Sequence, residues 1–402
     1  MDVDLSSLRS TVEHLARLDR APCSEGEHDA AQWIAAELAR QGCVARVEPE
    51  QVHGSFHTPL GLLALAAAAG GVAALRGHRL LGALAGGLSA ASMWEDLSGG
   101  ARRPFRRALP QDICHNVVAE AGDRNAERTL VVMAHHDAAR SSFLFDERVP
   151  RIAVEHFGWW VNRIDRWPPL MGVVVGAPSL VAAGSLTRRR RAIAAGTVLA
   201  AATAAVMRDM ARNDVVPGAN DNLTAVAALV ELARQVRERP IPGLRLLLVS
   251  TGAEEANQEG MLAFAARHFG SLPRETTDFL CLETIGSPEL VLIEGEGFLR
   301  MRDYPAATKE LVQACAHEAG VHLRRGLHLT FATDGLVPLR HGYRVASIGS
   351  VNEYLVPSNY HKPTDTPENV NFDSVADATR LSYAVAEELA SSNALSPPSR
   401  SQ

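Results

Sequence analysis

Histidine and carboxylate side chains occur in five short segments whose order along the chain could build a two-metal hydrolytic site. The segments are His135-His136-Asp137, Asn220-Asp221-Asn222, Glu254-Glu255, the run around Glu283, and Tyr360-His361. A pair of zinc ions needs nitrogen and oxygen ligands, one carboxylate that bridges the metals and one free carboxylate that moves protons. The five segments supply each of these parts and predict metal-assisted hydrolysis.

The surrounding sequence predicts the elements that would position these residues. Residues 129–139 form an apolar, β-branched run, which indicates a buried strand that ends near His135 and Asp137. We expect His135 to bind a metal and Asp137 to orient its imidazole. Residues 217–234 predict a turn followed by an amphipathic helix. Asp221 at the start of this helix would bridge the metals, where the helix dipole favours a carboxylate.

A second buried strand is predicted within residues 244–260, and it ends in two adjacent glutamates. Adjacent side chains at a strand end can point to different partners. We expect Glu255 to bind a metal. We expect Glu254 to act as the general base, which takes a proton from the attacking water and returns it to the leaving amine. Glu283 would complete the ligands of one ion, and His361 those of the other.

These motifs resemble the zinc aminopeptidases of clan MH, which include bacterial aminopeptidase S, vacuolar aminopeptidase Y and the glutamate carboxypeptidase II group. In that family the order is His-x-Asp, Asp-Asn, Glu-Glu, a further Asp or Glu, and a late His. The resemblance covers residues 1–57, 108–140 and 210–392. It implies two Zn²⁺ ions per chain, which Co²⁺ or Mn²⁺ could replace. The implied ligand sets are His135, Asp221 and Glu283 for one ion, and Asp221, Glu255 and His361 for the other.

The resemblance also concerns residues around the metals. The peptide between Asp221 and Asn222 matches one that is often cis in the family. Thr333 and Asp334 match a segment that lines the family's substrate pocket, although the same residues could equally form an ordinary turn. Tyr360 is a third candidate substrate-binding residue.

The predicted fold is α/β, with a mixed, mainly parallel sheet of eight strands between helices. The resemblance implies this fold, and the alternation of strand and helix patterns supports it. We expect the catalytic domain in residues 1–57, 94–168 and 208–392, and a disordered tail in residues 393–402. The sequence departs from the family pattern because Asp221 comes 84 positions after Asp137, a spacing far too long for the family.

Two apolar insertions account for the extra length, at residues 58–93 and 169–207. Each holds two uncharged runs split by a basic tip, at residues 76–79 and 187–191, and so predicts a helical hairpin. The hairpins could form a soluble cap or cross a membrane. We favour a membrane because the runs lack charge, contain glycines suited to close helix packing and are flanked by tryptophans. These residues are Gly70, Gly71, Gly82, Gly86 and Gly87, and Trp94, Trp159, Trp160 and Trp167.

The expected strand order places both hairpins near the metals. If successive strands are antiparallel, the strand at residues 44–52 is parallel to the one that ends at His135. Both hairpins then leave the same sheet edge, and the active site would face the bilayer. Ten arginines flank the hairpins on the catalytic side and six lie at the tips, which favours a cytoplasmic catalytic domain.

Composition excludes several other classes of protein. The 402-residue chain has a net charge of −6 and no dense basic and aromatic patch, which argues against nucleic-acid binding. Its five cysteines are scattered, which argues against a disulfide framework and a zinc ribbon and favours a reducing compartment. The first residues are acidic and amphipathic, unlike a signal peptide.

The sequence therefore predicts a membrane-associated metallo-aminopeptidase that releases N-terminal residues from peptides. Two alternatives remain open. The first is a single-zinc acyltransferase similar to glutaminyl cyclases. The second is a membrane scaffold in which the hydrolase fold is incidental. The sequence leaves the oligomeric state open.

Overall fold

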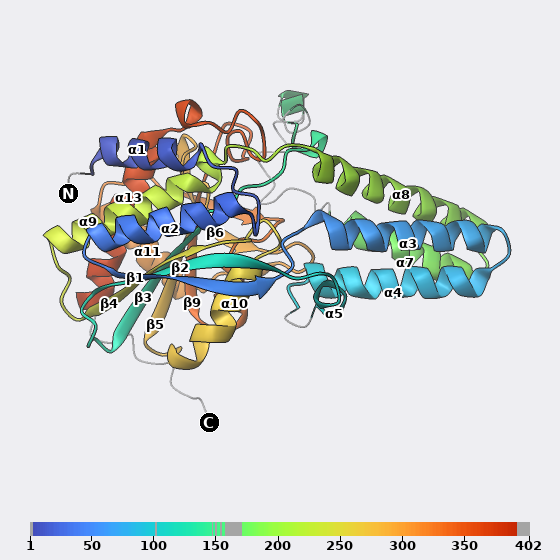
Figure 1. Ribbon diagram of the computed structural model, residues 1–402, viewed down its shortest axis with the longest axis horizontal. Coiled ribbons are helices and arrows are strands. Elements are labelled where there is room, and N and C mark those ends of the chain that lie inside the picture. Colours follow the sequence, from blue (N-terminus) through green and yellow to red (C-terminus); the bar gives the residue numbers. More distant parts are fainter. Residues whose placement is uncertain are drawn as a thin grey trace.

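The computed structural model describes residues 3–100, 103–146, 148, 151–152, 155–156 and 171–391. It consists of a mixed α/β domain, built on a nine-stranded sheet, and a long arm of four helices that projects from one end of this sheet (Figure 1). Three of the flanking tryptophans (Trp159, Trp160 and Trp167) and the predicted tail at residues 393–402 lie outside the described residues.

The strands are β1 (Val44–Val52), β2 (Asp112–Gly122), β3 (Arg128–His135), β4 (Leu244–Thr251), β5 (Thr277–Leu282), β6 (Glu289–Glu296), β7 (Arg302–Asp303), β8 (Arg324–Leu329) and β9 (Arg344–Val351). Their order is β1-β2-β4-β3-β5-β9-β6-β7, and β8 pairs with β6. The prediction of a mainly parallel, eight-stranded sheet was wrong in detail. Only four of the eight pairings are parallel, because β2 is antiparallel to β1 and β4, and β6 is antiparallel to β9 and β7. The short β7 adds a ninth strand.

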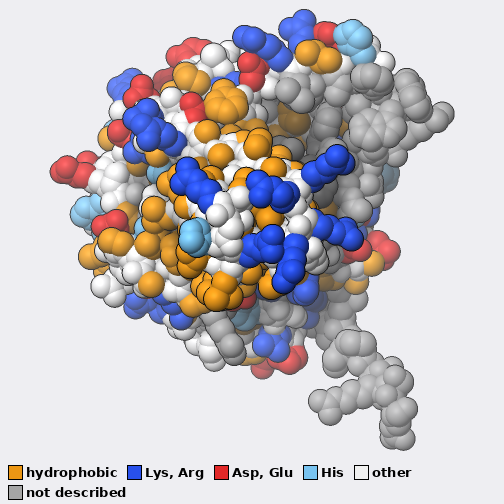
Figure 2. All heavy atoms as spheres, turned by 90° about the vertical axis from the view of Figure 1, so that its right-hand side faces the viewer, with side chains coloured by type: hydrophobic (Ala, Val, Ile, Leu, Met, Phe, Trp, Pro, Cys, Tyr) orange, Lys and Arg blue, Asp and Glu red, His pale blue; other side chains and the backbone are white. Residues whose placement is uncertain are grey.

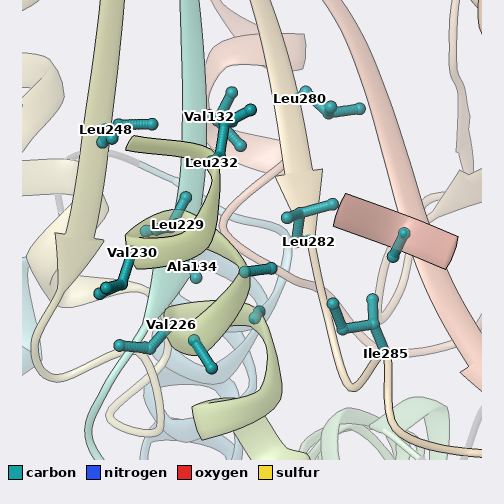
Figure 3. Close-up of a cluster of buried hydrophobic side chains, with 14 of the residues drawn as sticks. Val132, Ala134, Val226, Leu229, Val230, Leu232, Leu248, Leu280, Leu282 and Ile285 are labelled. Atoms are coloured by element: carbon teal, nitrogen blue, oxygen red, sulfur yellow. The ribbon is translucent and has the colours of Figure 1, made fainter. Parts of the chain in front are cut away.

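Helices cover both faces of the sheet. One face carries α1 (Leu5–Leu15), α2 (Glu25–Arg40), α9 (Thr224–Glu238), α11 (Ala306–Glu318) and α13 (Phe372–Ser391), and the other carries α10 (Glu259–His268) and α12 (Leu336–Arg340). Each face of the sheet has its own apolar core. Side chains alternate along β3, so Val132 belongs to the core on the first face and Val131 to the core on the second. Figure 3 shows Val226 and Leu229 of α9 lying against the first core.

The arm consists of two helical hairpins packed as a four-helix bundle (Figure 1). Its helices are α3 (His57–Leu75), α4 (Arg79–Leu97), α7 (Met171–Leu186) and α8 (Arg190–Arg212). Helix α3 packs on α4 and α8, and α7 packs on the same two helices. These helices extend beyond the uncharged runs because the polar residues at their ends are also helical. The short helix α5 (Pro104–Arg107) follows the first hairpin.

Small residues fill the interior of the bundle. A Cβ atom added to Gly86 would lie 2.7 Å from Ala182 N and Pro178 O of α7, so the two backbones are in direct contact. Gly70, Gly71 and Gly82 also face neighbouring helices, as expected. Gly87 does not: a Cβ atom there meets nothing within 4 Å. The packing role predicted for Gly87 was therefore wrong.

The outer surface of the bundle is apolar. Leucines and valines are exposed on all four helices, including Leu65 (57%), Leu88 (68%), Leu186 (73%) and Val198 (67%). Two of the helices, α3 and α8, are long and apolar enough to cross a membrane, and α7 is a shorter apolar helix. A soluble bundle places its large apolar side chains inside. This bundle buries small residues such as Ala67, Ala177 and Ala200 together with larger ones near the sheet, and it also leaves leucine and valine side chains exposed along its sides.

Both hairpins leave the sheet at the edge that carries His135. Strand β1 is antiparallel to β2, β2 is antiparallel to β4, and β4 is parallel to β3. Strands β1 and β3 therefore run in the same direction, as predicted, although β2 is not a neighbour of β3. The first hairpin begins five residues after Val52, the end of β1. The root of the arm thus lies at the carboxyl ends of β1 and β3.

Candidate metal centre

Three predicted ligands come together beside the end of β3. His135 is the last residue of β3, Asp221 lies in the turn η2 (Ala219–Leu223) before α9, and Glu283 directly follows β5. The Nε2 atom of His135 lies 3.2 Å from Asp221 Oδ1 and 3.3 Å from Glu283 Oε1. All three residues are buried. Strand ends thus deliver two of the ligands, and the start of a helix delivers the third.

The other predicted ligands form a second triad on the same bridging residue. The Nε2 atom of His361 lies 3.1 Å from Asp221 Oδ2 and 3.2 Å from Glu255 Oε1. Each oxygen of Asp221 therefore faces a different histidine. Within each triad the three ligand atoms lie within 4.8 Å of one another, and the same is true of the group His135, Glu254 and Glu255. The peptide between Asp221 and Asn222 is cis, as the resemblance implied.

The donor atoms fit zinc in kind and in spacing. Ligand atoms bound to a tetrahedral zinc ion at about 2.0–2.1 Å lie about 3.3 Å apart. The observed nitrogen–oxygen separations of 3.1 to 3.3 Å match this spacing. Asp221 Oδ2 and His361 Nε2 are also buried and make no hydrogen bond within the described part of the chain. Buried polar atoms are normally paired, and a shared cation would satisfy both of these.

Electrostatics favour a cation here as well. Burial raises the pKa of Glu254 well above its usual range, and the neighbouring carboxylates Asp334, Glu283 and Glu255 raise it further. Burial lowers the pKa of His361, but the charge of Glu255 and the other carboxylates outweighs this effect and raises it to about 10. The centre thus gathers several carboxylates in a buried setting, and bound divalent cations would offset their negative charge.

Asp137 connects the first histidine to the two glutamates. Its Oδ1 atom lies 3.3 Å from His135 Nδ1 and accepts the backbone N–H of Glu254 at 3.1 Å. Its Oδ2 atom accepts the backbone N–H of Glu255 at 3.0 Å. The sequence predicted only the contact with the imidazole. The structure adds that Asp137 also holds the turn that carries Glu254 and Glu255.

Arg20 and Asp365, which the sequence did not indicate, hold the loops that carry the proposed ligands. Arg20 is fully buried and donates hydrogen bonds to the carbonyl oxygens of His136 (2.8 Å) and Pro217 (2.8 Å). It therefore ties the end of β3 to the loop that leads into Asp221. From the other side, Asp365 accepts the backbone N–H groups of Asn220 (2.7 Å) and Asp221 (3.1 Å).

The candidate substrate residues lie beside this centre but differ in their surroundings. Thr333 and Tyr360 line a pocket together with Glu254 and Glu283, whereas Asp334 accepts a short hydrogen bond from the Thr251 hydroxyl next to it. The remaining wall of the pocket is mostly apolar. It includes Ile293, Leu327, Leu329, Phe331, Val351 and Leu355.

The sequence also gave no sign of an aromatic contact at the second triad. The ring of Phe145, in the short helix η1 (Phe143–Phe145), lies 4.4 Å from the ring of His361 and 5.7 Å from that of Tyr360. The Tyr360 ring stacks on His361 at 3.9 Å. Phe145 precedes the second insertion, far from His361 in sequence, and only the structure shows that the two rings are in contact.

Comparisons with known proteins agree with this geometry. Residues 203–386 match the sequence profile described as Peptidase family M28. This segment contains Asp221, Glu254, Glu255, Glu283 and His361, whereas His135 and Asp137 precede it. None of the curated proteins matches the chain in sequence.

Several solved structures share the fold at low sequence identity. An aminopeptidase from Aneurinibacillus sp. strain AM-1 is 13% identical with a TM-score of 0.56, over 96% of this chain and 94% of the other. A Zn-dependent exopeptidase from Parabacteroides distasonis is 12% identical with a TM-score of 0.55, over 98% and 99% of the two chains. A glutaminyl cyclase from Bacteroides thetaiotaomicron is 13% identical with a TM-score of 0.58, over 96% and 98%.

The comparisons thus agree with the family resemblance that the motifs indicated. The M28 segment carries five of the seven metal-centre residues, and the whole chain has the fold of zinc exopeptidases. The match over residues 203–386 and the shared fold thus bear out the resemblance to zinc peptidases and support a zinc-dependent hydrolase.

Proposed function

We propose that this protein is a membrane-associated di-zinc aminopeptidase. The observation that carries the proposal is the pair of three-residue ligand sets that share Asp221, with Glu254 beside both. His135, Asp221 and Glu283 would hold one ion, and Asp221, Glu255 and His361 the other. A metal bound by these residues would polarise a substrate carbonyl and lower the pKa of water.

Glu254 is the residue that we assign to proton transfer. It is not needed as a ligand in either set, and it lies in the pocket beside Glu255. Burial raises its pKa, which suits a group that must take a proton from water and then return it to the leaving amine. Asp137 fixes its backbone by accepting its N–H. The apolar wall of the pocket favours substrates whose N-terminal side chain is apolar.

The proposed membrane association rests on the arm. Helices α3 and α8 have the length and composition of membrane-spanning helices. The arm exposes leucine and valine on its sides and packs glycine inside, as helices do in lipid. Figure 2, which faces the end of the arm, shows arginine side chains around apolar ones. We propose that both hairpins cross the bilayer and that the catalytic domain is cytoplasmic. Arg102, Arg163 and Arg166, which entered the charge count, lie outside the described residues.

Glutaminyl cyclization is the second candidate, because glutaminyl cyclases from two organisms share the fold. Such an enzyme would use one zinc and form an amide within its substrate. The presence of two triads favours the di-zinc hydrolase, because a single ion would need only one of them. In a membrane scaffold, by contrast, Glu254 would have no role.

The test combines metal analysis with turnover. Detergent-purified protein should contain about two zinc ions per chain and should hydrolyse aminoacyl fluorogenic amides with apolar side chains. A chelator should abolish this hydrolysis. Glu254→Gln should keep both ions and lose turnover, whereas Glu255→Gln should lose metal. One ion per chain with cyclized product would favour the cyclase. Unchanged cellular function in Glu254→Gln would favour the scaffold.

A further inference from the structure

We propose that this active site acts on peptides whose N-terminus is held at the surface of a lipid bilayer, within a few residues of the anchoring segment. The inference rests on the proposed function and adds a class of substrate to it. It follows from how closely the catalytic centre and the root of the arm are joined.

A single aromatic side chain touches both the metal centre and the arm. Phe145 packs against the apolar cluster at the root, which includes Leu60 of α3 and Met210 of α8. The same ring lies 4.4 Å from the ring of His361, a proposed metal ligand. The root of the arm is therefore one side chain away from the catalytic centre.

The pocket wall is joined to the root in a second place. The backbone N–H of Gly297 donates to the carbonyl oxygens of Leu329 and Phe331, both of which line the pocket. The next residue, Phe298, packs into the root cluster, and its ring lies 6.3 Å from that of Phe56 just before α3. The loop after β6 thus lies between the pocket wall and the start of the arm.

A buried ion pair and buried hydrogen bonds join the arm to the loops of the catalytic centre. Arg106 forms a two-pronged ion pair with Asp96 at the end of α4, with both distances 2.8 Å, and donates to Ala256 O at 2.9 Å. Ala256 directly follows the two catalytic-site glutamates. In the second hairpin, α8 ends nine residues before Asp221. In the segment that connects them, the backbone N–H of Val216 donates a hydrogen bond to the carbonyl oxygen of Ala139. Each hairpin is therefore fastened to a loop that carries proposed ligands.

The surface around the root has the composition of a membrane interface. Phe143 and Leu144, directly before Phe145, are 64% and 37% exposed, although both are large and apolar. Trp94 of α4 is 41% exposed, and the guanidinium of Arg300 lies 5.2 Å from its ring centre. Aromatic and arginine side chains are favoured together at the boundary between lipid and water. A bilayer around the arm would therefore reach the level of Phe143, next to the catalytic centre.

The geometry predicts how far a substrate must reach from its anchor. An extended peptide spans about 3.3–3.6 Å per residue. A site at the bilayer surface needs a spacer of only a few residues between the anchor and the N-terminus. A site on the far side of the catalytic domain would need a spacer of about 15 residues or more to cross roughly 50 Å.

The experiment uses the full-length protein, loaded with zinc and reconstituted in phosphatidylcholine vesicles. The substrates are quenched fluorescent peptides that begin with leucine. They carry a C-terminal palmitoyl anchor after a spacer of 4, 8 or 16 residues, and an unanchored peptide of the same sequence serves as reference. We expect kcat/KM for the 4-residue spacer to exceed that of the unanchored peptide at least tenfold and to equal or exceed that of the 16-residue spacer.

A pair of matched variants separates membrane contact from folding. The double substitution Phe143→Ser with Leu144→Ser should remove most of the gain for anchored peptides and leave the unanchored rate unchanged. Leu5→Ser with Val44→Ser is the control. It alters two residues of similar exposure, 44% and 48%, in α1 and at the start of β1. This control should keep the gain.

The outcomes are distinguishable. Equal rates for anchored and unanchored peptides, or cleavage that requires the 16-residue spacer, would overturn the inference while leaving the peptidase intact. Loss of the protein from the vesicles at alkaline pH would overturn the membrane arm, and the inference with it. Absence of hydrolysis with every peptide, including the unanchored one, would overturn the proposed function itself.

Discussion

The Oδ1 atom of Asp137 accepts the backbone N–H of Glu254 at 3.1 Å, across 117 residues of sequence. The neighbouring Oδ2 atom accepts the N–H of Glu255. One carboxylate thus sets both the orientation of His135 and the course of the turn that presents the proposed base and ligand. A change in this side chain should affect both sides of the centre at once.

Asp137→Asn should therefore impair metal binding and catalysis together. An amide keeps only one oxygen acceptor and turns an NH₂ group toward one of the two backbone N–H groups. We expect kcat/KM to fall by about 100-fold and zinc affinity by about 10-fold or more, the range known for residues that support metal ligands. Isothermal titration with zinc and steady-state kinetics would measure both. Asp29→Asn, on the exposed side of α2, is the control and should change neither. Normal zinc affinity in Asp137→Asn would contradict the role assigned to this side chain.

Arg20→Met should destabilise the fold and loosen the metal centre. The substitution leaves the carbonyl oxygens of His136 and Pro217 without their Arg20 donor, whereas Leu15 O keeps the backbone N–H of Leu18. Each unsatisfied buried group costs about 1–3 kcal/mol, so we expect a loss of at least about 2 kcal/mol in the free energy of unfolding. Denaturant unfolding of the zinc-free protein would measure it. Arg17→Met, at an exposed position three residues earlier, should stay within about 0.5 kcal/mol of wild type. Similar losses in both variants would show that the buried bonds of Arg20 are not the cause.

Sequence patterns could predict the proposed ligands because metal chemistry restricts residue types. His135 and Glu255 each stand where a predicted strand ends, and strand ends at one edge of a sheet come together in space. Strand β1 has the bounds that its sequence predicted. No comparable sequence pattern indicated Arg20. Its partners are main-chain carbonyls, which every residue possesses, and they lie as far as 197 residues away.

In the arm, too, the sequence predicted the elements but not all of their contacts. The apolar runs and their basic tips predicted two hairpins, but the sequence could not show which glycines face the interior. Adjacent residues on a helix point about 100° apart, so Gly86 and Gly87 cannot both face one neighbour. The packing partner decides between them, and only the fold defines that partner.

Gly86→Leu and Gly87→Leu should therefore differ sharply. A leucine at residue 86 would meet the backbone of α7 at Ala182 and Pro178 and force the helices apart, whereas the same change at residue 87 points into open space. Overpacking costs about 1–3 kcal/mol. We expect Gly86→Leu to lower the melting temperature of the detergent-purified protein by several degrees and Gly87→Leu to leave it nearly unchanged. The two variants add the same apolar side chain, so each controls for the other. Equal melting temperatures would contradict the close packing of α4 on α7.

Glu296 should make the stability of the protein depend on pH. It is fully buried, and burial raises its pKa to about 8, although hydrogen bonds from Tyr304 and Thr333 oppose the shift. In an unfolded chain the pKa of a glutamate is about 4.3. A folded-state pKa above the unfolded value means that folding favours the protonated form. The resulting stability is fully present below about pH 4.3 and is lost as the pH rises to about 8.

Glu296→Gln removes this titration and should flatten the curve of melting temperature against pH. Between pH 5 and pH 8 the wild type should lose several degrees more than the variant, because each unit of pKa difference is worth about 1.4 kcal/mol. Burial also raises the pKa of Asp365 to about 7. Some dependence of the melting temperature on pH should therefore remain in both proteins. Differential scanning calorimetry at fixed ionic strength would measure the slopes. Glu13→Gln, at an exposed position on α1, should keep the wild-type slope. If Glu296→Gln also keeps it, then Glu296 is ionised in the folded protein and its burial does not control its charge.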